Sequence, residues 1–264
     1  MRSARFGVLL GILLLNIPVF AQQTSTAITS SPALKDPQAV SVLNQAINAA
    51  GGTTAIAAIT DYSAIGKIIY NNNANEQGSV MLRGLGLIAF RLDANLPPGV
   101  RSLTISEGQT SQKSEDGAIS HLFIQAPMFP GSFVLPCLLL ANALESSTFS
   151  VSYQGLVQVD GHSAHEIQVQ RQIPQGISAP GVLTVFFTKE LFIDASTSQV
   201  VMTREISGRH RVIRQIHYSD YRSTGGLMLP FGISEEYGNR QTLAISLDQI
   251  TCNSGLQVSS FDLQ

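Results

Sequence analysis

From Asp61 onward the sequence alternates apolar and polar residues, and this period of two limits the fold more than any other feature. Within residues 79–93 the odd positions include Arg83 and Arg91, and the even positions are Val80, Leu82, Gly84, Gly86, Ile88, Phe90 and Leu92. Two later runs alternate in the same way, Leu227, Leu229, Phe231, Ile233 and Leu243, Ile245, Leu247. Because successive side chains of a strand point to opposite faces, these runs predict strands with one apolar face.

Turn-forming pairs separate the alternating runs. Asp116-Gly117 and Asp160-Gly161 are strong hairpin signals. Further turns are expected at Asn71–Gly78, Glu107-Gly108, Ser207-Gly208, Gly225-Gly226 and Gly238-Asn239. The spacing suits consecutive antiparallel strands, so we expect a meander of about ten or eleven strands.

One amphipathic helix precedes the strands. Asp36 is an N-cap followed by Pro37 at the first helical position. An apolar stripe at helical spacing follows, and Gly51-Gly52 ends it: Val40, Leu43, Ala46, Ile47 and Ala50. A short helical turn is expected over residues 54–59.

A second helix is expected inside the meander. Phe133–Leu144 reads FVLPCLLLANAL, and Pro136 suits the start of a helix. Because the segment is apolar nearly all round, the helix has to be buried, near 136–144. We therefore predict an α+β domain: a curled antiparallel sheet forming an unclosed β-barrel, with the N-terminal helix and the short buried helix covering its concave side.

The first 21 residues have the features of a secretory signal peptide. Arg2 and Arg5 precede the apolar run 8–17, and Val19-Phe20-Ala21 offers a cleavage site before Gln22. The run is about half the ~20 residues of a membrane span, so a membrane anchor is the weaker alternative. We expect a flexible leader over 22–35, one domain over 36–264, a periplasmic or secreted location and no integral membrane segment after cleavage.

Composition excludes some functions. Net charge is −2 and charged residues are 13% of the chain, so nothing favours binding to nucleic acid or an anionic membrane. The two cysteines, Cys137 and Cys252, could form a disulfide after export. Two buried free thiols are the simpler account, since Cys137 falls in an apolar helix and Cys252 at a strand end.

The sequence shows no catalytic, metal or cofactor motif. His162, His165 and Glu166 lie in a predicted strand, where residues three apart point to opposite faces and do not converge on one ion. The serine-hydrolase and phosphate-loop motifs are absent. Asp194, Asp220 and Glu235-Glu236 fall near strand ends or turns, where solvated or turn-capping acids are ordinary.

Several short segments form a recognisable pattern: Phe90-Arg91-Leu92-Asp93 with Pro97-Pro98, Leu103–Gln109, Leu191–Ser198, Ser219–Phe231, and Asn253–Leu256 with Phe261. These segments resemble the LolA family of periplasmic lipoprotein carriers. The resemblance implies an unclosed antiparallel barrel with helices at its open side, and a cavity that shelters acyl chains. The sequence departs from that family in having no Trp and in placing Leu92 where an aromatic residue is usual.

The leading functional hypothesis is a non-catalytic periplasmic protein that binds lipid or lipoprotein acyl chains in an apolar cavity between sheet and helices. The residues expected to line this cavity are Leu82, Ile88, Phe90, Leu92, Phe133, Leu138 and Leu139. The alternative is a structural or sensory envelope module of the same fold that recognises a protein partner, with a filled interior and an exposed apolar patch. A secreted hydrolase would need converging polar groups.

Overall fold

The computed structural model describes residues 34–71, 75–122, 129–172, 187–207 and 212–263. The predicted signal peptide, residues 1–21, lies outside these ranges, as do residues 22–33 of the predicted leader and the turn at Ser207-Gly208 in part. All described residues belong to one compact unit, Pro32–Gln264. Among them, no helix combines the length and the apolar character needed to cross a membrane.

Helix α1 (Pro37–Ala49) begins where the sequence predicts. The Asp36 carboxylate caps it by accepting hydrogen bonds from the backbone N–H groups of Gln38, at 2.8 Å, and Ala39, at 3.4 Å. The buried face carries Ala39, Val42, Leu43, Ala46 and Ile47. Gly51 then turns the chain with a φ of 122°, and α2 (Thr53–Ala57) follows.

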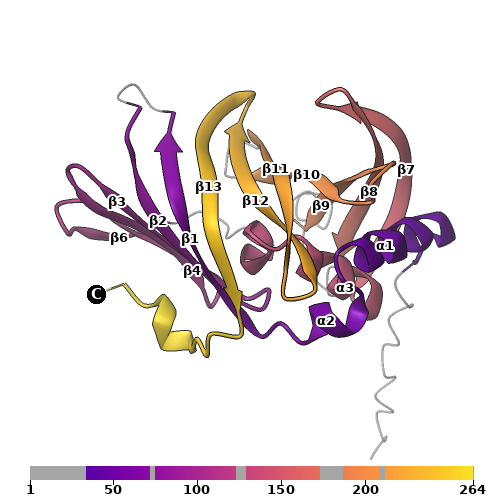
Figure 1. Ribbon diagram of the computed structural model, residues 1–264, viewed down its shortest axis with the longest axis horizontal. Coiled ribbons are helices and arrows are strands. Elements are labelled where there is room, and N and C mark those ends of the chain that lie inside the picture. Colours follow the sequence, from indigo (N-terminus) through magenta and orange to yellow (C-terminus); the bar gives the residue numbers. More distant parts are fainter. Residues whose placement is uncertain (1–33, 72–74, 123–128, 173–186, 208–211, 264) are drawn as a thin grey trace, which may run out of the picture. The chain divides into compact units, whose positions relative to one another are not determined.

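Thirteen described strands form one antiparallel sheet, in the order β6-β5-β4-β3-β2-β1-β13-β12-β11-β10-β9-β8-β7 (Figure 1). They are β1 (Asp61–Tyr70), β2 (Gln77–Leu85), β3 (Ala89–Leu96), β4 (Gly99–Ser106), β5 (Gln109–Lys113), β6 (Ile119–Leu122), β7 (Phe149–Val159), β8 (His162–Arg171), β9 (Thr188–Asp194), β10 (Val200–Ser207), β11 (Val212–Thr224), β12 (Leu227–Tyr237) and β13 (Arg240–Cys252). The chain runs outward to β6, restarts at the opposite edge with β7, and returns to pair β13 with β1. Because β6 and β7 remain edges, the predicted unclosed barrel is confirmed.

The number of strands is larger than the sequence suggested. The short strands β5 and β6 have no alternating apolar residues, and three of the four positions of β6 are exposed. The buried side chains of β5, Thr110 and Ser111, are polar, so neither strand leaves an apolar period-two signal. Only the expected turns at Glu107-Gly108 and Asp116-Gly117 pointed to them.

Residues 79–93 form a hairpin rather than one strand. Leu82 pairs with Leu92 and Gly84 with Phe90, and residues 86–88 make the turn. Paired residues are both even-numbered, so the apolar alternation continues unbroken through the turn. The alternation therefore gave the correct face for both strands and concealed the reversal between them.

Between β6 and β7 the chain passes through a 3₁₀ turn, η1 (Pro130–Phe133), and α3 (Cys137–Glu145), inside the curve of the sheet (Figure 1). The predicted buried helix is thus confirmed: six of its nine residues are buried. The Lys35 ammonium donates to the backbone oxygens of Ala143 and, at 3.1 Å, Ser146, where the helix ends.

Glycines let η1 approach the sheet closely. A Cβ atom on Gly131 would lie 1.9 Å from the backbone oxygen of Gly86, and one on Gly84 would lie 2.2 Å from the ring of Tyr62. The buried Tyr62 hydroxyl donates to the Gly131 oxygen at 3.0 Å. These contacts hold η1 against β1 and β2.

The C-terminal segment packs on the outer face of the sheet. The Thr104 hydroxyl of β4 donates to the Phe261 oxygen at 2.7 Å, and Phe261, in η2 (Val258–Phe261), is buried. The Arg91 guanidinium of β3 donates to the Asp262 oxygen at 2.7 Å. Both cysteines are free thiols, which was the simpler of the two accounts. Cys137 is buried, and Cys252 is partly buried.

Candidate functional site

The predicted cavity residues divide into two groups. Six are buried in the main hydrophobic cluster: Leu82, Phe90, Leu92, Phe133, Leu138 and Leu139. Ile88 is 67% exposed because it lies in the turn between β2 and β3. The structure therefore brings the predicted residues of β2 and β3 together with those of η1 and α3. It leaves Ile88 at the end of the β2–β3 hairpin.

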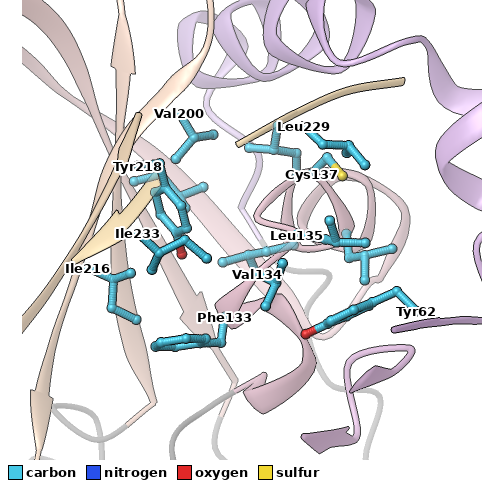
Figure 2. Packing of buried hydrophobic residues seen from close by; sticks show 14 of the residues in the cluster. Tyr62, Phe133, Val134, Leu135, Cys137, Val200, Ile216, Tyr218, Leu229 and Ile233 are labelled. Atoms are coloured by element: carbon cyan, nitrogen blue, oxygen red, sulfur yellow. The ribbon is translucent and has the colours of Figure 1, made fainter. Parts of the chain in front are cut away.

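Side chains fill most of the space between the sheet and the segment formed by η1 and α3. Figure 2 shows Phe133, Val134, Leu135 and Cys137 packed against residues of β10, β11 and β12, among them Ile216, Tyr218 and Ile233. The interior pocket that remains is about 60 Å³. It is lined by Phe90, Leu92, Leu103, Ile105, Phe129, Pro130, Phe133, Lys189, Arg214, Ile216, Glu235 and Leu243. Leu82, Leu138 and Leu139 pack in the core and do not line this pocket.

A much larger pocket, which we call the rim pocket, lies where several turns and strand ends meet. Its volume is about 690 Å³. It is lined by Leu85, Leu87, Ile88, Ala89, Ser106, Glu107, Gly108, Phe129, Pro130, Asn142, Ser146, Thr148, Phe149, Arg171, Phe187 and Val258. Apolar side chains predominate in this lining, and Ile88 is the only one of the seven predicted residues among these described lining residues.

Phe129 and Pro130 line both pockets. Phe129 has a positive φ of 63°, which is a genuine outlier for an aromatic residue. Its ring meets that of Phe149 edge-on at 5.0 Å, while the Phe90 and Phe133 rings lie 4.9 Å apart on the interior side. Aromatic side chains therefore form the partition between the rim pocket and the interior pocket.

One wall of the interior pocket is charged. Lys189, Glu205, Arg214 and Glu235 come from β9, β10, β11 and β12 in turn, and we call them the charged ladder. Arg214 bonds Glu205 at 2.8 Å and Glu235 at 2.6 Å, and the Lys189 ammonium lies 3.4 Å from Glu205. Each of the four is at least nine-tenths buried. Such charges are stable only when paired.

Pairing favours the charged forms of Glu205 and Arg214. Burial lowers the pKa of Lys189. Burial would raise the pKa of Glu205, but the neighbouring Lys189 and Arg214 outweigh it and hold that pKa below its usual value. Burial opposes the charge of Arg214 too, yet the carboxylates of Glu235 and Glu205 raise its pKa. The guanidinium also lies 5.6 Å from the centre of the Phe133 ring.

The expectation that Glu235 is a solvated or turn acid is wrong. The apolar series Leu227, Leu229, Phe231 and Ile233 continues with Glu235 on the same inner face, where Arg214 holds it. The spacing was the signal in the sequence, because a carboxylate two residues beyond an alternating apolar series lies on the same face of the strand as that series. Lys189 stands in the same relation to Leu191 on β9.

Asp194 lies at the end of β9, as expected, whereas Asp220 lies within β11, so the expectation that Asp220 is at a strand end or turn is wrong. Asp194 accepts hydrogen bonds from the backbone and hydroxyl groups of Ser196 and Thr197, which lower its pKa to about 2 although burial opposes this. Asp220 has a φ of 52° and bonds Arg222 at the surface. Neither faces the pockets.

His162, His165 and Glu166 lie on β8, as predicted, and have separate partners. His165 bonds the Tyr153 hydroxyl at 3.0 Å, whereas Glu166 pairs with Arg204 at 2.9 Å. His162 lies 4.0 Å from Asp194. Within the described ranges, no three His, Cys, Asp or Glu side chains are grouped closely enough to hold a metal ion.

Phe90, Leu92, Leu103 and Ile105, in the segments that resemble LolA proteins, line the interior pocket. Other, polar side chains of these segments hold the frame together. Asp93 accepts hydrogen bonds from Arg83, Arg91 and Ser102 on three strands. Near the C-terminus, the Asn253 side-chain amide accepts a hydrogen bond from the Thr60 backbone N–H at 2.8 Å and donates one to the Ala58 oxygen at 2.9 Å. Their role in this chain is to fix strand order and the path of the C-terminal segment.

Comparison of the fold with known proteins agrees with this architecture. No family model matches the sequence, and neither does any curated protein. A DUF1329 family protein from Desulfovibrio piger is similar in structure, with 9% identity and a TM-score of 0.55 over 86% of this chain and 99% of that one. A LolA superfamily protein from Nitrosomonas europaea has 10% identity and a TM-score of 0.52 over 85% and 97%. The chain thus has a LolA-like fold.

Proposed function

We propose that the protein is a non-catalytic binding protein of the cell envelope that holds lipid or lipoprotein acyl chains, with the rim pocket as the site of entry. The observation that carries the proposal is the apolar rim pocket of about 690 Å³, which adjoins the interior pocket at Phe129 and Pro130. The predicted signal peptide supports a periplasmic or secreted location.

The size and lining of the rim pocket suit an acyl chain. Small-molecule sites commonly occupy about 300–1,000 Å³ and are mostly apolar. Each buried CH₂ group contributes roughly 0.8 kcal/mol, so an acyl chain binds without many placed polar groups. The site differs from the one expected from the sequence, because α3 packs tightly and the open volume lies at the end of the β2–β3 hairpin.

A second candidate is recognition of a protein partner at the same end of the sheet. Ile88 is 67% exposed and Val258 is 49% exposed, and both line the rim pocket. Exposed apolar side chains grouped in this way also suit a protein contact. The interior is largely filled by side chains, and a filled interior is what the protein-partner candidate predicts.

A pair of matched variants tests the acyl-chain proposal. Ile88→Arg places a charge at the rim pocket, whereas Leu156→Arg changes a similarly exposed residue, 60% exposed, on β7 and outside the pocket lining. We expect Ile88→Arg to weaken uptake of a fluorescent fatty acid at least tenfold, because the acyl chain would have to cover a charged group in place of an apolar one. Leu156→Arg should bind as the wild type does.

Equal uptake by both folded variants would count against the rim pocket. No uptake by the wild-type protein would reject the acyl-chain proposal and favour the protein-partner candidate. Circular dichroism of both variants controls for folding.

A further inference from the structure

Arg171 lines the rim pocket from the inner face of β8. Ile167 and Val169 are buried on that face, and Arg171 follows them at the same spacing of two residues. In the pairing of β7 with β8, Arg171 stands directly opposite Phe149, whose ring contacts that of Phe129 at 5.0 Å. Because directly opposite residues of an antiparallel pair share a face, the Arg171 side chain lies next to the aromatic partition.

Arg171 also differs from most arginines of the chain in having no carboxylate partner. The arginines that pair with acids are Arg83, Arg91, Arg101, Arg204, Arg214 and Arg222. Within the described part of the chain, Arg171 and Arg240 form no ion pair, and the Arg171 side chain donates no hydrogen bond. Arg240 is exposed at the start of β13, outside the lining of the rim pocket, whereas Arg171 adjoins apolar side chains. The five N–H groups of the Arg171 guanidinium are thus available to an acceptor at the pocket.

The lining of the rim pocket is divided into a polar side and an apolar side. Asn142, Ser146 and Thr148 lie on α3 and on the chain that leads from it into β7, the strand that pairs with Arg171. The hydroxyls of Ser146 and Thr148 bond each other at 2.8 Å, whereas the Asn142 side-chain amide bonds no other described residue. The β2–β3 hairpin supplies only apolar side chains to the lining: Leu85, Leu87, Ile88 and Ala89. An amphiphilic molecule can therefore place its hydrocarbon chain against the hairpin and its polar group against Arg171.

Charges around the pocket favour an anionic polar group. Glu107 is the other charged residue of the described lining, and it lies in the exposed turn after β4, where it forms no ion pair with Arg171. At the end of α3, the Lys35 ammonium donates to the backbone oxygens of Ala143 and Ser146, so these oxygens do not face an incoming anion without a compensating charge. Arg171 is the charge that continues an apolar inner face, and an anion bound there stays away from Glu107.

We propose that Arg171 binds the anionic group, a carboxylate or a phosphate, of an amphiphile whose hydrocarbon chain occupies the rim pocket. This inference rests on the proposed acyl-chain function and narrows its ligands to acidic amphiphiles. A guanidinium donates two parallel hydrogen bonds to either anion, which a neutral headgroup cannot match. The Asn142 amide can donate a further hydrogen bond from the same side of the pocket.

Isothermal titration calorimetry of the full mature chain tests the inference with four compounds that share a decyl chain. They are decanoate, decyl phosphate, decanol and decyltrimethylammonium, each used below the concentration at which it aggregates. We expect decanoate or decyl phosphate to bind about fivefold or more tightly than decanol, since a bidentate charged contact exceeds an ordinary surface ion pair. Decyltrimethylammonium should bind most weakly. The anion that binds more tightly identifies the headgroup as a carboxylate or a phosphate.

The matched variants are Arg171→Gln and Arg240→Gln, each of which removes an exposed arginine without a carboxylate partner among the described residues. Arg171→Gln should reduce the preference for the anion over decanol to about one- to twofold and leave the affinity for decanol unchanged. Arg240→Gln should keep the full preference of the wild type.

A preference that survives in Arg171→Gln would overturn the inference. Equal affinities for all four compounds in the wild type would overturn it as well, without needing any variant to fold, and acyl-chain binding would stand. Tightest binding of decyltrimethylammonium would also overturn it and would assign the polar contact to Glu107. No binding of any of the four would reject both this inference and the proposed function.

Discussion

The two inner walls of the sheet differ in one respect. On β2 to β4 the inner face carries Leu82, Phe90, Leu92 and Ile105, all apolar and buried. On β9 to β12 the inner face carries apolar residues and also the charged ladder, which is equally buried. An alternating sequence therefore specifies which residues face inward, but it does not ensure that the inward residues are apolar.

The difference has an energetic meaning. Apolar burial on β2 to β4 stabilises the fold by roughly 25 cal/mol per Å² removed from water. On β9 to β12 the attraction within the ladder mainly offsets the cost of removing its charges from water. The ladder therefore adds little net stability, although removing one of its partners would be strongly destabilising.

The largest expected effect comes from breaking the ladder at its centre. Arg214→Leu would leave Glu205 and Glu235 buried without their shared partner, which should cost about 3–5 kcal/mol in the free energy of unfolding. Urea denaturation measures it.

The matched control is Arg204→Leu. Arg204 also bridges two glutamates, Glu166 and Glu190, but its side chain is 33% exposed. We expect a loss of about 1 kcal/mol or less there. Equal losses for the two arginines would show that the ladder is not a strongly buried network.

On the apolar wall, Leu92→Ala should lower the free energy of unfolding by about 3 kcal/mol through lost burial and a new cavity. Its control is Leu156→Ala on β7, where the side chain is 60% exposed and the change should stay within about 0.5 kcal/mol. A small loss at Leu92 would mean that the interior is more open than about 60 Å³.

The smallest effect concerns the turn that follows β9. Asp194→Ala removes the acceptor for Ser196 and Thr197 and should cost about 1 kcal/mol near neutral pH. The pKa of Asp194 is lowered from 3.8 to about 2, so its contribution is full above pH 3.8 and is lost as the pH falls through 2.

Urea denaturation of wild type and Asp194→Ala at neutral pH and near pH 2 tests this directly. The difference between the two proteins should shrink on acidification. A difference that stays constant would mean that the turn depends on the shape of the side chain rather than on its charge.

Much of the fold followed from local rules in the sequence. Asp36-Pro37 predicted the start of α1, and the apolar run after Pro136 predicted a buried helix. The turn at 86–88 was missed because the hairpin preserves the alternation across it. Strands β5 and β6 carry no alternating apolar residues, so only the turn signals at Glu107-Gly108 and Asp116-Gly117 pointed to them.

The site was harder to predict than the fold. Six of the seven predicted residues are buried together, but the sequence did not show that α3 would fill the interior and move the open volume to the rim. Pockets depend on how side chains from distant strands meet, which periodicity does not encode. Glu235 follows Leu227, Leu229, Phe231 and Ile233 at the same spacing of two residues. This position predicts that Glu235 faces inward, but the sequence analysis assumed that a carboxylate would not lie on the inner face.

The central claim is that this fold holds an acyl chain. Native mass spectrometry of the mature protein, purified from the periplasm without detergent, tests it most directly. We predict adducts with lipid masses that disappear on denaturation. A clean mass of the protein alone, together with no uptake of a fluorescent fatty acid, would contradict the account.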